Sequence, residues 1–183
     1  MEAGRSLLQA VDRLSVAFGY LAGAMYVVLA FFITYDVLAR KWGASLGLPT
    51  TQVTDEISGY MLALAATWGL AYALRCGSHV RVDVLFPHLT KRLRAVVDFV
   101  AFVLMAAFAG VVSWKIWVLV ADSWESGLRS STYLLTPLYV PQFILGVGFS
   151  LLALSAALIA VAMLAGWEQA GASPLATPDE PVL

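Results

Sequence analysis

The sequence predicts an all-α, polytopic membrane protein with four transmembrane helices and short interfacial amphipathic helices. Of the 183 residues, 61% are hydrophobic and 13% are charged, whereas a soluble domain has roughly 45–50% apolar and about 25% charged residues. The mean hydropathy is +0.82, and four long apolar runs separate the clusters of charge. A soluble core of this size cannot enclose so many apolar side chains, so much of the surface must face lipid.

Each apolar run is long enough for one membrane crossing. A helix needs roughly 20 apolar residues to cross about 30 Å of hydrocarbon, and within lipid only helical backbone satisfies its own hydrogen bonds. The predicted spans are residues 14–38, 56–75, 95–121 and 138–166, the last beginning between Pro137 and Pro141. The first apolar run exceeds the roughly 7–15 residues of a signal-peptide core, so we interpret it as a retained anchor.

The four spans form a single predicted transmembrane domain, residues 1–167. Residues 168–183 contain three prolines together with small and acidic residues. Such a composition does not bury enough apolar surface to fold, so we expect a disordered C-terminal tail.

Lysine and arginine in short loops set the orientation of a membrane protein. The N-terminal segment and the loop between the second and third spans carry seven of these residues, and the other two loops carry three. Both termini are therefore predicted to be cytoplasmic. Aromatic residues that suit the headgroup level gather toward the opposite side: Trp42, Trp114, Trp117, Trp124, Tyr133 and Tyr139.

Two amphipathic stretches are predicted to lie along the membrane. Leu7, Val11 and Leu14 recur at helical spacing before the first span. In the middle loop, a helix from about His88 would place an apolar stripe on one side and basic residues off it, where membrane phospholipids with anionic headgroups would be partners. The stripe is Leu85, Leu89, Leu93 and Val96, and the basic residues are Lys91, Arg92 and Arg94.

No cofactor, metal or catalytic site is predicted. Haem in a helical bundle needs axial ligands inside the spans, usually histidine, but His79 and His88 both lie in the middle loop. The middles of the spans hold no Asp, Glu or His, which argues against ion-coupled transport by this chain alone. The net charge of −1 gives no reason to expect nucleic acid.

The charged residues at the predicted outer ends allow two interpretations. Arg40 could pair with Glu56 and join the first two helices. Alternatively, Asp55 and Glu56 could stabilise the start of the second helix through its dipole. Lys115 is the one charge inside a predicted span, and we interpret it as snorkelling to the outer interface.

Small residues are frequent in the last three spans and allow close helix contact, either within the bundle or with another membrane protein. They include Gly59, Ala63, Ala66, Gly69, Ala106, Ala109, Gly110, Gly146, Gly148 and Ala153.

Taken in order, four short patterns resemble the small, four-helix membrane subunit (the Q-type permease subunit) of tripartite ATP-independent periplasmic (TRAP) transporters. They are Tyr35–Arg40, Thr54–Glu56, the loop Gly77–Leu85, and Thr136–Pro141 followed by Gly148. The resemblance covers roughly residues 15–165. Asp55 stands where the pattern favours a second glutamate.

The resemblance implies a non-catalytic scaffold in a bacterial inner membrane. It would support a large sodium-coupled membrane subunit that takes up an organic acid anion delivered by a periplasmic binding protein. Partner or lipid contacts are expected at Arg40, Asp55, Glu56, Arg81, Lys91, Arg92, Arg94, Lys115, Asp122, Glu125 and Arg129. The alternatives are a membrane-anchor subunit of a redox enzyme and a small self-assembling carrier.

Overall fold

The computed structural model describes residues 2–46, 53–76, 90–132 and 134–164. These residues form four helices, α1 (Glu2–Leu46), α2 (Thr54–Arg75), α3 (Lys91–Glu125) and α4 (Tyr139–Leu164). All four are long and apolar enough to cross a membrane, which confirms the predicted fold class. The domain limit at residue 167 stays a prediction, and the predicted tail, residues 168–183, lies outside the described residues.

The structure differs from the sequence prediction in one detail, because neither amphipathic stretch is a separate element where it is described. Residues 7–14 continue without a break into the first span. No proline or glycine interrupts them, and extending an existing helix costs far less than starting a new one. Leu93 and Val96 lie in the first two turns of α3, whereas Leu85 and Leu89 lie outside the described residues.

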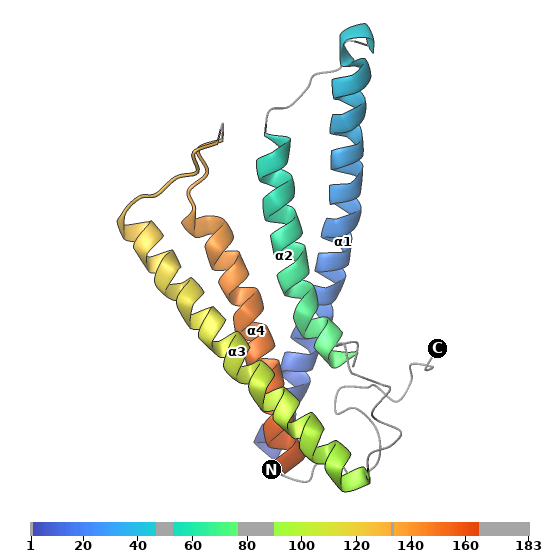
Figure 1. The fold of residues 1–183 in the computed structure, drawn as a ribbon, viewed down its shortest axis with the longest axis vertical. Coiled ribbons are helices and arrows are strands. Elements are labelled where there is room, and N and C mark those ends of the chain that lie inside the picture. The colour runs from blue at the N-terminus through green and yellow to red at the C-terminus, as the bar shows by residue number, and fades with distance from the viewer. Residues whose placement is uncertain (1, 47–52, 77–89, 133, 165–183) are drawn as a thin grey trace.

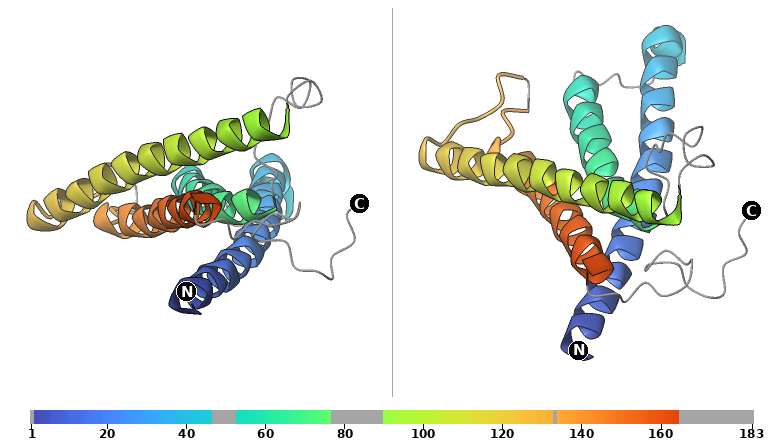
Figure 2. Two further views of the ribbon diagram at one scale, coloured as in Figure 1. Left: turned by 90° about the horizontal axis from the view of Figure 1, so that it is seen from below. Right: turned by 60° about the horizontal axis from the view of Figure 1, so that its bottom comes forward.

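The helices are arranged as two antiparallel hairpins, α1 with α2 and α3 with α4. The hairpins meet near the N-terminus of α1 and diverge toward the other end (Figure 1). Viewed from below, α2 and α4 lie between α1 and α3 (Figure 2). Contact between α2 and α4 therefore joins the two hairpins. We call the end at which α2 and α4 begin the predicted outer end.

Two apolar clusters fill the region where the hairpins meet. The larger joins α2, α3 and α4, and its buried members are Leu74, Ala109, Leu152, Ala156 and Ile159. The smaller joins α1, α2 and α4 through Val11, Ala71 and Leu151. Small side chains bring the helices close together at both places, as expected for helix packing in membranes.

A single tryptophan links both hairpins. Trp68 of α2 donates a hydrogen bond from Nε1 to the backbone oxygen of Ile144 in α4, at 3.0 Å. A Cβ atom at Gly148 would lie 2.8 Å from Trp68 Cδ1 and 3.1 Å from Thr67 Cβ, so only glycine leaves room for the indole. On its other side, Trp68 meets the Phe18 ring of α1 edge-on, with centroids 4.7 Å apart.

The second hairpin has its own polar link between α3 and α4. Ser150 Oγ donates to the backbone oxygen of Gly146 at 2.7 Å and accepts from Trp117 Nε1 at 3.0 Å. Ser113 Oγ lies 2.7 Å from Ser150 Oγ. Because the Ser150 proton is already used, Ser113 is the donor in that pair. These bonds satisfy hydroxyl groups that lipid cannot solvate.

Candidate partner-docking surface at the predicted outer end

The C-terminus of α3 is fixed by a Schellman motif, which turns the chain back toward α4. Leu128 N–H donates to the oxygen of Ser123 at 3.1 Å, and Gly127 N–H donates to the oxygen of Trp124 at 3.3 Å. Gly127 has a φ of +60°, the left-handed conformation that this motif requires and that glycine adopts without strain.

The chain between α3 and α4, which we call the α3–α4 loop, forms a short antiparallel hairpin over the described residues 128–132 and 134–138. Arg129 and Pro137 form an isolated antiparallel β-bridge. Ser130 N–H donates to Thr136 O at 2.8 Å, and Leu138 N–H donates to Leu128 O at 3.1 Å. These backbone contacts give the described residues of the loop a defined conformation.

The tip of the α3–α4 loop exposes two apolar side chains. Leu134 is 45% exposed and Leu135 is 54% exposed. Leu135 has a φ of +49°, which is strained for a residue with a Cβ atom and persists only where the surroundings hold it. The bond from Leu135 N–H to the oxygen of Thr132, 3.1 Å long, supplies part of that restraint. An ordered apolar tip of this kind suits contact with another surface.

Glu56 ties the α3–α4 loop to the start of α2. Its Oε1 accepts a hydrogen bond from Tyr60 at 3.0 Å, and its Oε2 accepts one from the Thr132 hydroxyl. Thr132 is itself bonded to the Ser130 hydroxyl. Figure 1 shows the loop extending beside the beginning of α2. These hydrogen bonds from Tyr60 and Thr132 to Glu56, which we call the tether, join the two hairpins a second time, far from Trp68.

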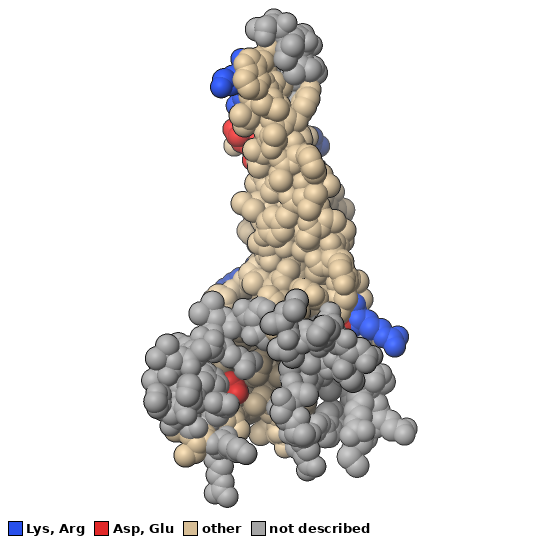
Figure 3. Space-filling model, turned by 90° about the vertical axis from the view of Figure 1, so that its right-hand side faces the viewer, with Lys and Arg blue, Asp and Glu red and all other residues tan. Residues whose placement is uncertain are grey.

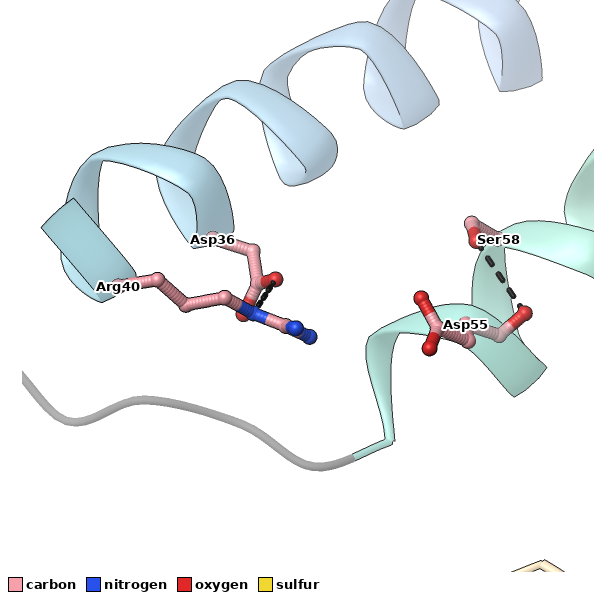
Figure 4. Close-up of polar contacts among 4 residues, drawn as sticks. All are labelled: Asp36, Arg40, Asp55 and Ser58. Carbon is pink, nitrogen blue, oxygen red and sulfur yellow. Dashed lines mark hydrogen bonds and ion pairs between the residues drawn. The ribbon is translucent and has the colours of Figure 1, made fainter.

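The ion pair observed for Arg40 is with its own helix. Arg40 Nε lies 2.7 Å from Asp36 Oδ2, and the Asp36 side chain is only 4% exposed. The Arg40 guanidinium extends toward the start of α2, where the Asp55 carboxylate faces it (Figure 4). Asp55 and Glu56 both occupy the first turn of α2, the place where the helix dipole favours acidic groups.

The remaining predicted contact residues at this end are exposed. Lys115 lies beside Trp114, with Nζ 4.9 Å from the ring centroid, a cation–π contact typical of interfacial side chains. Asp122, Glu125 and Arg129 are exposed on the last turn of α3 and in the α3–α4 loop. Seen from the α1 side, a band of uncharged surface separates the charges near the two ends (Figure 3).

The predicted basic contact residues belong to the opposite end. Lys91, Arg92 and Arg94 occupy the first turn of α3, which Thr90 caps by accepting a hydrogen bond from Leu93 N–H at 3.4 Å. Arg81 lies outside the described residues, as do His79 and His88. Among the described residues, no group of three or more His, Cys, Asp or Glu side chains could hold a metal ion.

The hydrogen-bond partners of Glu56 were not predicted from the sequence. Tyr60 stands four residues later on the same helix face, a spacing that could have indicated the bond. Thr132 is 76 residues away in sequence, and nothing in its local pattern points to Glu56.

One known protein family matches most of the chain. The family described as tripartite ATP-independent periplasmic transporters, DctQ component, matches residues 29–166. The chain belongs to this family. It is thus a multi-pass membrane component of a TRAP transporter, and its four apolar helices and its family together indicate the bacterial inner membrane.

One relative of this DctQ component is the isethionate TRAP transporter permease protein DctMQ of Oleidesulfovibrio alaskensis. It is 26% identical over 136 residues, which make up 73% of this chain and 21% of that protein. The chain therefore spans about a fifth of the length of this curated relative. No solved structure matches the chain.

The tether predicts the behaviour of the α3–α4 loop. Thr132→Val removes the hydroxyl that Glu56 accepts from, so the amides of Ser130 and Leu138 should exchange with deuterium several-fold faster because the loop opens more often. Hydrogen exchange followed by mass spectrometry measures this rate. Ser131→Ala, at an exposed neighbour, should leave exchange unchanged. Equal exchange in both variants would show that the tether does not hold the loop.

Proposed function

We propose that this DctQ component is a non-catalytic scaffold for a separate, large, sodium-coupled membrane subunit. That subunit would carry out uptake of an organic acid anion delivered by a soluble periplasmic binding protein. The observation that carries the proposal is a contrast within the bundle. The helices pack closely against one another on the inside, whereas broad apolar helix faces are exposed on the outside.

Exposed faces of α1 and α3 supply surface for a membrane partner. On α1, Tyr20, Val27 and Phe31 are 72%, 57% and 73% exposed. On α3, Leu104, Phe108 and Val111 are 64%, 66% and 58% exposed. The spacing of three, four or seven residues puts each set on one helix face. Within a bilayer such faces contact lipid or another membrane protein.

Several hydroxyl groups within the described spans donate hydrogen bonds to the backbone of their own helix. Thr34 Oγ1 donates to Ala30 O at 2.7 Å, and Thr67 Oγ1 donates to Ala63 O at 3.0 Å. Ser155 Oγ likewise donates to Leu151 O at 2.7 Å. These are hydroxyl bonds back to the same helix. They favour a supporting role over a site that binds an ion or a substrate.

The curated relative supports the rest of the proposal. Its name describes a permease for isethionate, an organic acid anion, and this chain matches about a fifth of it. The unmatched part of that relative is long enough to contain a larger membrane subunit beside its DctQ part. The binding protein would dock at the predicted outer end, where Asp55, Glu125 and Arg129 are exposed.

The orientation in this proposal places both termini in the cytoplasm. The basic residues Arg81, Lys91, Arg92 and Arg94 would then lie near the anionic headgroups of the inner leaflet, where each cation near the surface contributes attraction. The α3–α4 loop and the charged end of α1 would face the periplasm.

Affinity purification of the tagged chain in mild detergent tests the scaffold proposal. We expect one large polytopic membrane protein to be recovered in equal amount, and uptake of an organic acid anion to be lost when either gene is deleted. Phe31→Ala and Phe108→Ala form a matched pair for the two exposed faces. The variant on the partner-facing helix should lower recovery, since truncating a lipid-facing side chain costs little.

Two outcomes of the purification would contradict the scaffold proposal. Recovery with a haem or flavin protein would support the redox-anchor alternative. Transport by the purified chain reconstituted alone would support the self-assembling carrier.

Cys76 tests the orientation, because it is exposed and is the one cysteine of the chain. A membrane-impermeant maleimide should leave it unlabelled in intact cells and label it after permeabilisation. A chain carrying Cys76→Ser and Ser131→Cys should show the opposite behaviour, since Ser131 is exposed in the α3–α4 loop. Labelling of Cys76 in intact cells would reverse the proposed topology.

A further inference from the structure

A groove of about 560 Å³ lies between the last turns of α3 and the first turns of α4. Its walls include Trp117, Ala121 and Trp124 on α3, with Tyr139 and Phe143 on α4. The volume falls within the usual range of small-molecule sites, about 300–1,000 Å³. Of the predicted partner-contact residues, Glu125 alone lines this groove.

The aromatic walls are held in place by contacts with one another. Trp117 and Phe143 meet edge-to-face with centroids 5.2 Å apart, and Trp124 and Tyr139 do so at 4.7 Å. The polar edge of Trp117 is occupied, because its Nε1 donates to Ser150 Oγ at 3.0 Å. The groove therefore presents mainly hydrocarbon, and its shape exists before any ligand binds.

The dimensions of the groove favour a slender occupant. From Trp117 to Glu125, α3 rises about 12 Å, at about 1.5 Å per residue. Spread over that length, the volume of about 560 Å³ gives a mean cross-section of roughly 45 Å². An extended hydrocarbon chain fits within this cross-section.

Charge at the rim indicates the kind of headgroup. Glu125 is the one ionisable carboxylate of the lining and is exposed, and no lysine or arginine lines the groove among the described residues. A carboxylate attracts an ammonium group, and tryptophan and tyrosine faces attract it as well. The groove also lies at the level of the predicted aromatic belt, where phospholipid headgroups meet acyl chains.

We propose that this groove binds an acyl chain of a phosphatidylethanolamine molecule, with the ammonium headgroup held above Glu125. The bound lipid would fill the space between the ends of α3 and α4, next to the α3–α4 loop. Binding depends on residues of this chain alone, so it holds whatever large subunit the chain supports.

Native mass spectrometry of the purified full chain tests this site, with dioleoyl phosphatidylethanolamine and dioleoyl phosphatidylglycerol added in equal amounts. We expect preferential retention of one phosphatidylethanolamine. Ala121→Phe fills the groove from α3 and should lower this retention roughly tenfold, since excluding even two methylenes from an apolar site has an effect of that size. Ala107→Phe is the matched control, because Ala107 is exposed on α3 and does not line the groove.

Val140→Phe fills the groove from the α4 wall and serves if Ala121→Phe does not fold. Glu125→Gln should make retention of the two lipids equal. The acyl-chain site is wrong if both groove-filling variants retain phosphatidylethanolamine as well as Ala107→Phe does. The headgroup assignment is wrong if Glu125→Gln keeps the preference. Loss of a co-purifying protein in place of lipid would make the groove a protein contact.

Discussion

Trp68, packed against Gly148, is the contact on which the arrangement of the four helices depends. Its indole touches α1 through Phe18, reaches the backbone of α4 by a hydrogen bond, and occupies space that any larger residue at Gly148 would fill. In a bilayer, lipid tails are as apolar as the side chains, so burial alone gives little force for helix association. Close packing and an interhelical hydrogen bond must supply it, and Trp68 supplies both.

The two hairpins diverge from that contact toward the predicted outer end (Figure 1). There the α3–α4 loop connects the two hairpins, because the Thr132 hydroxyl donates a hydrogen bond to Glu56 of α2. Two hairpins that are joined at two separated places resist movement relative to each other. Its broad apolar faces on α1 and α3 remain available to a membrane partner. Both features support the scaffold role proposed for this chain.

Sequence patterns predicted the helices because each span is a local property, set by the length of an apolar run and the charges at its ends. Such local patterns could not predict which helices pack against one another. Trp68 and Ile144 are 76 residues apart, and Gly148 was recognised as small without any indication of what lies against it. The Arg40–Asp36 ion pair could more easily have been predicted. Asp36 stands four residues earlier on the same helix face, which is a favourable spacing for opposite charges. Contact of the predicted site residues with a partner stays a prediction.

Thermal unfolding of the purified chain in detergent, followed by helical circular dichroism, tests the role of the Trp68–Gly148 contact most directly. Gly148→Ala forces a methyl group into the indole, and overpacking of about 1–3 kcal/mol in a chain of this size lowers the Tm by roughly 3–10 °C. Gly59→Ala is the matched control, because no atom lies within 4 Å of the position its Cβ would take. The account predicts a lower Tm for Gly148→Ala alone. Equal Tm values for the two variants would show that the hairpins are held together elsewhere.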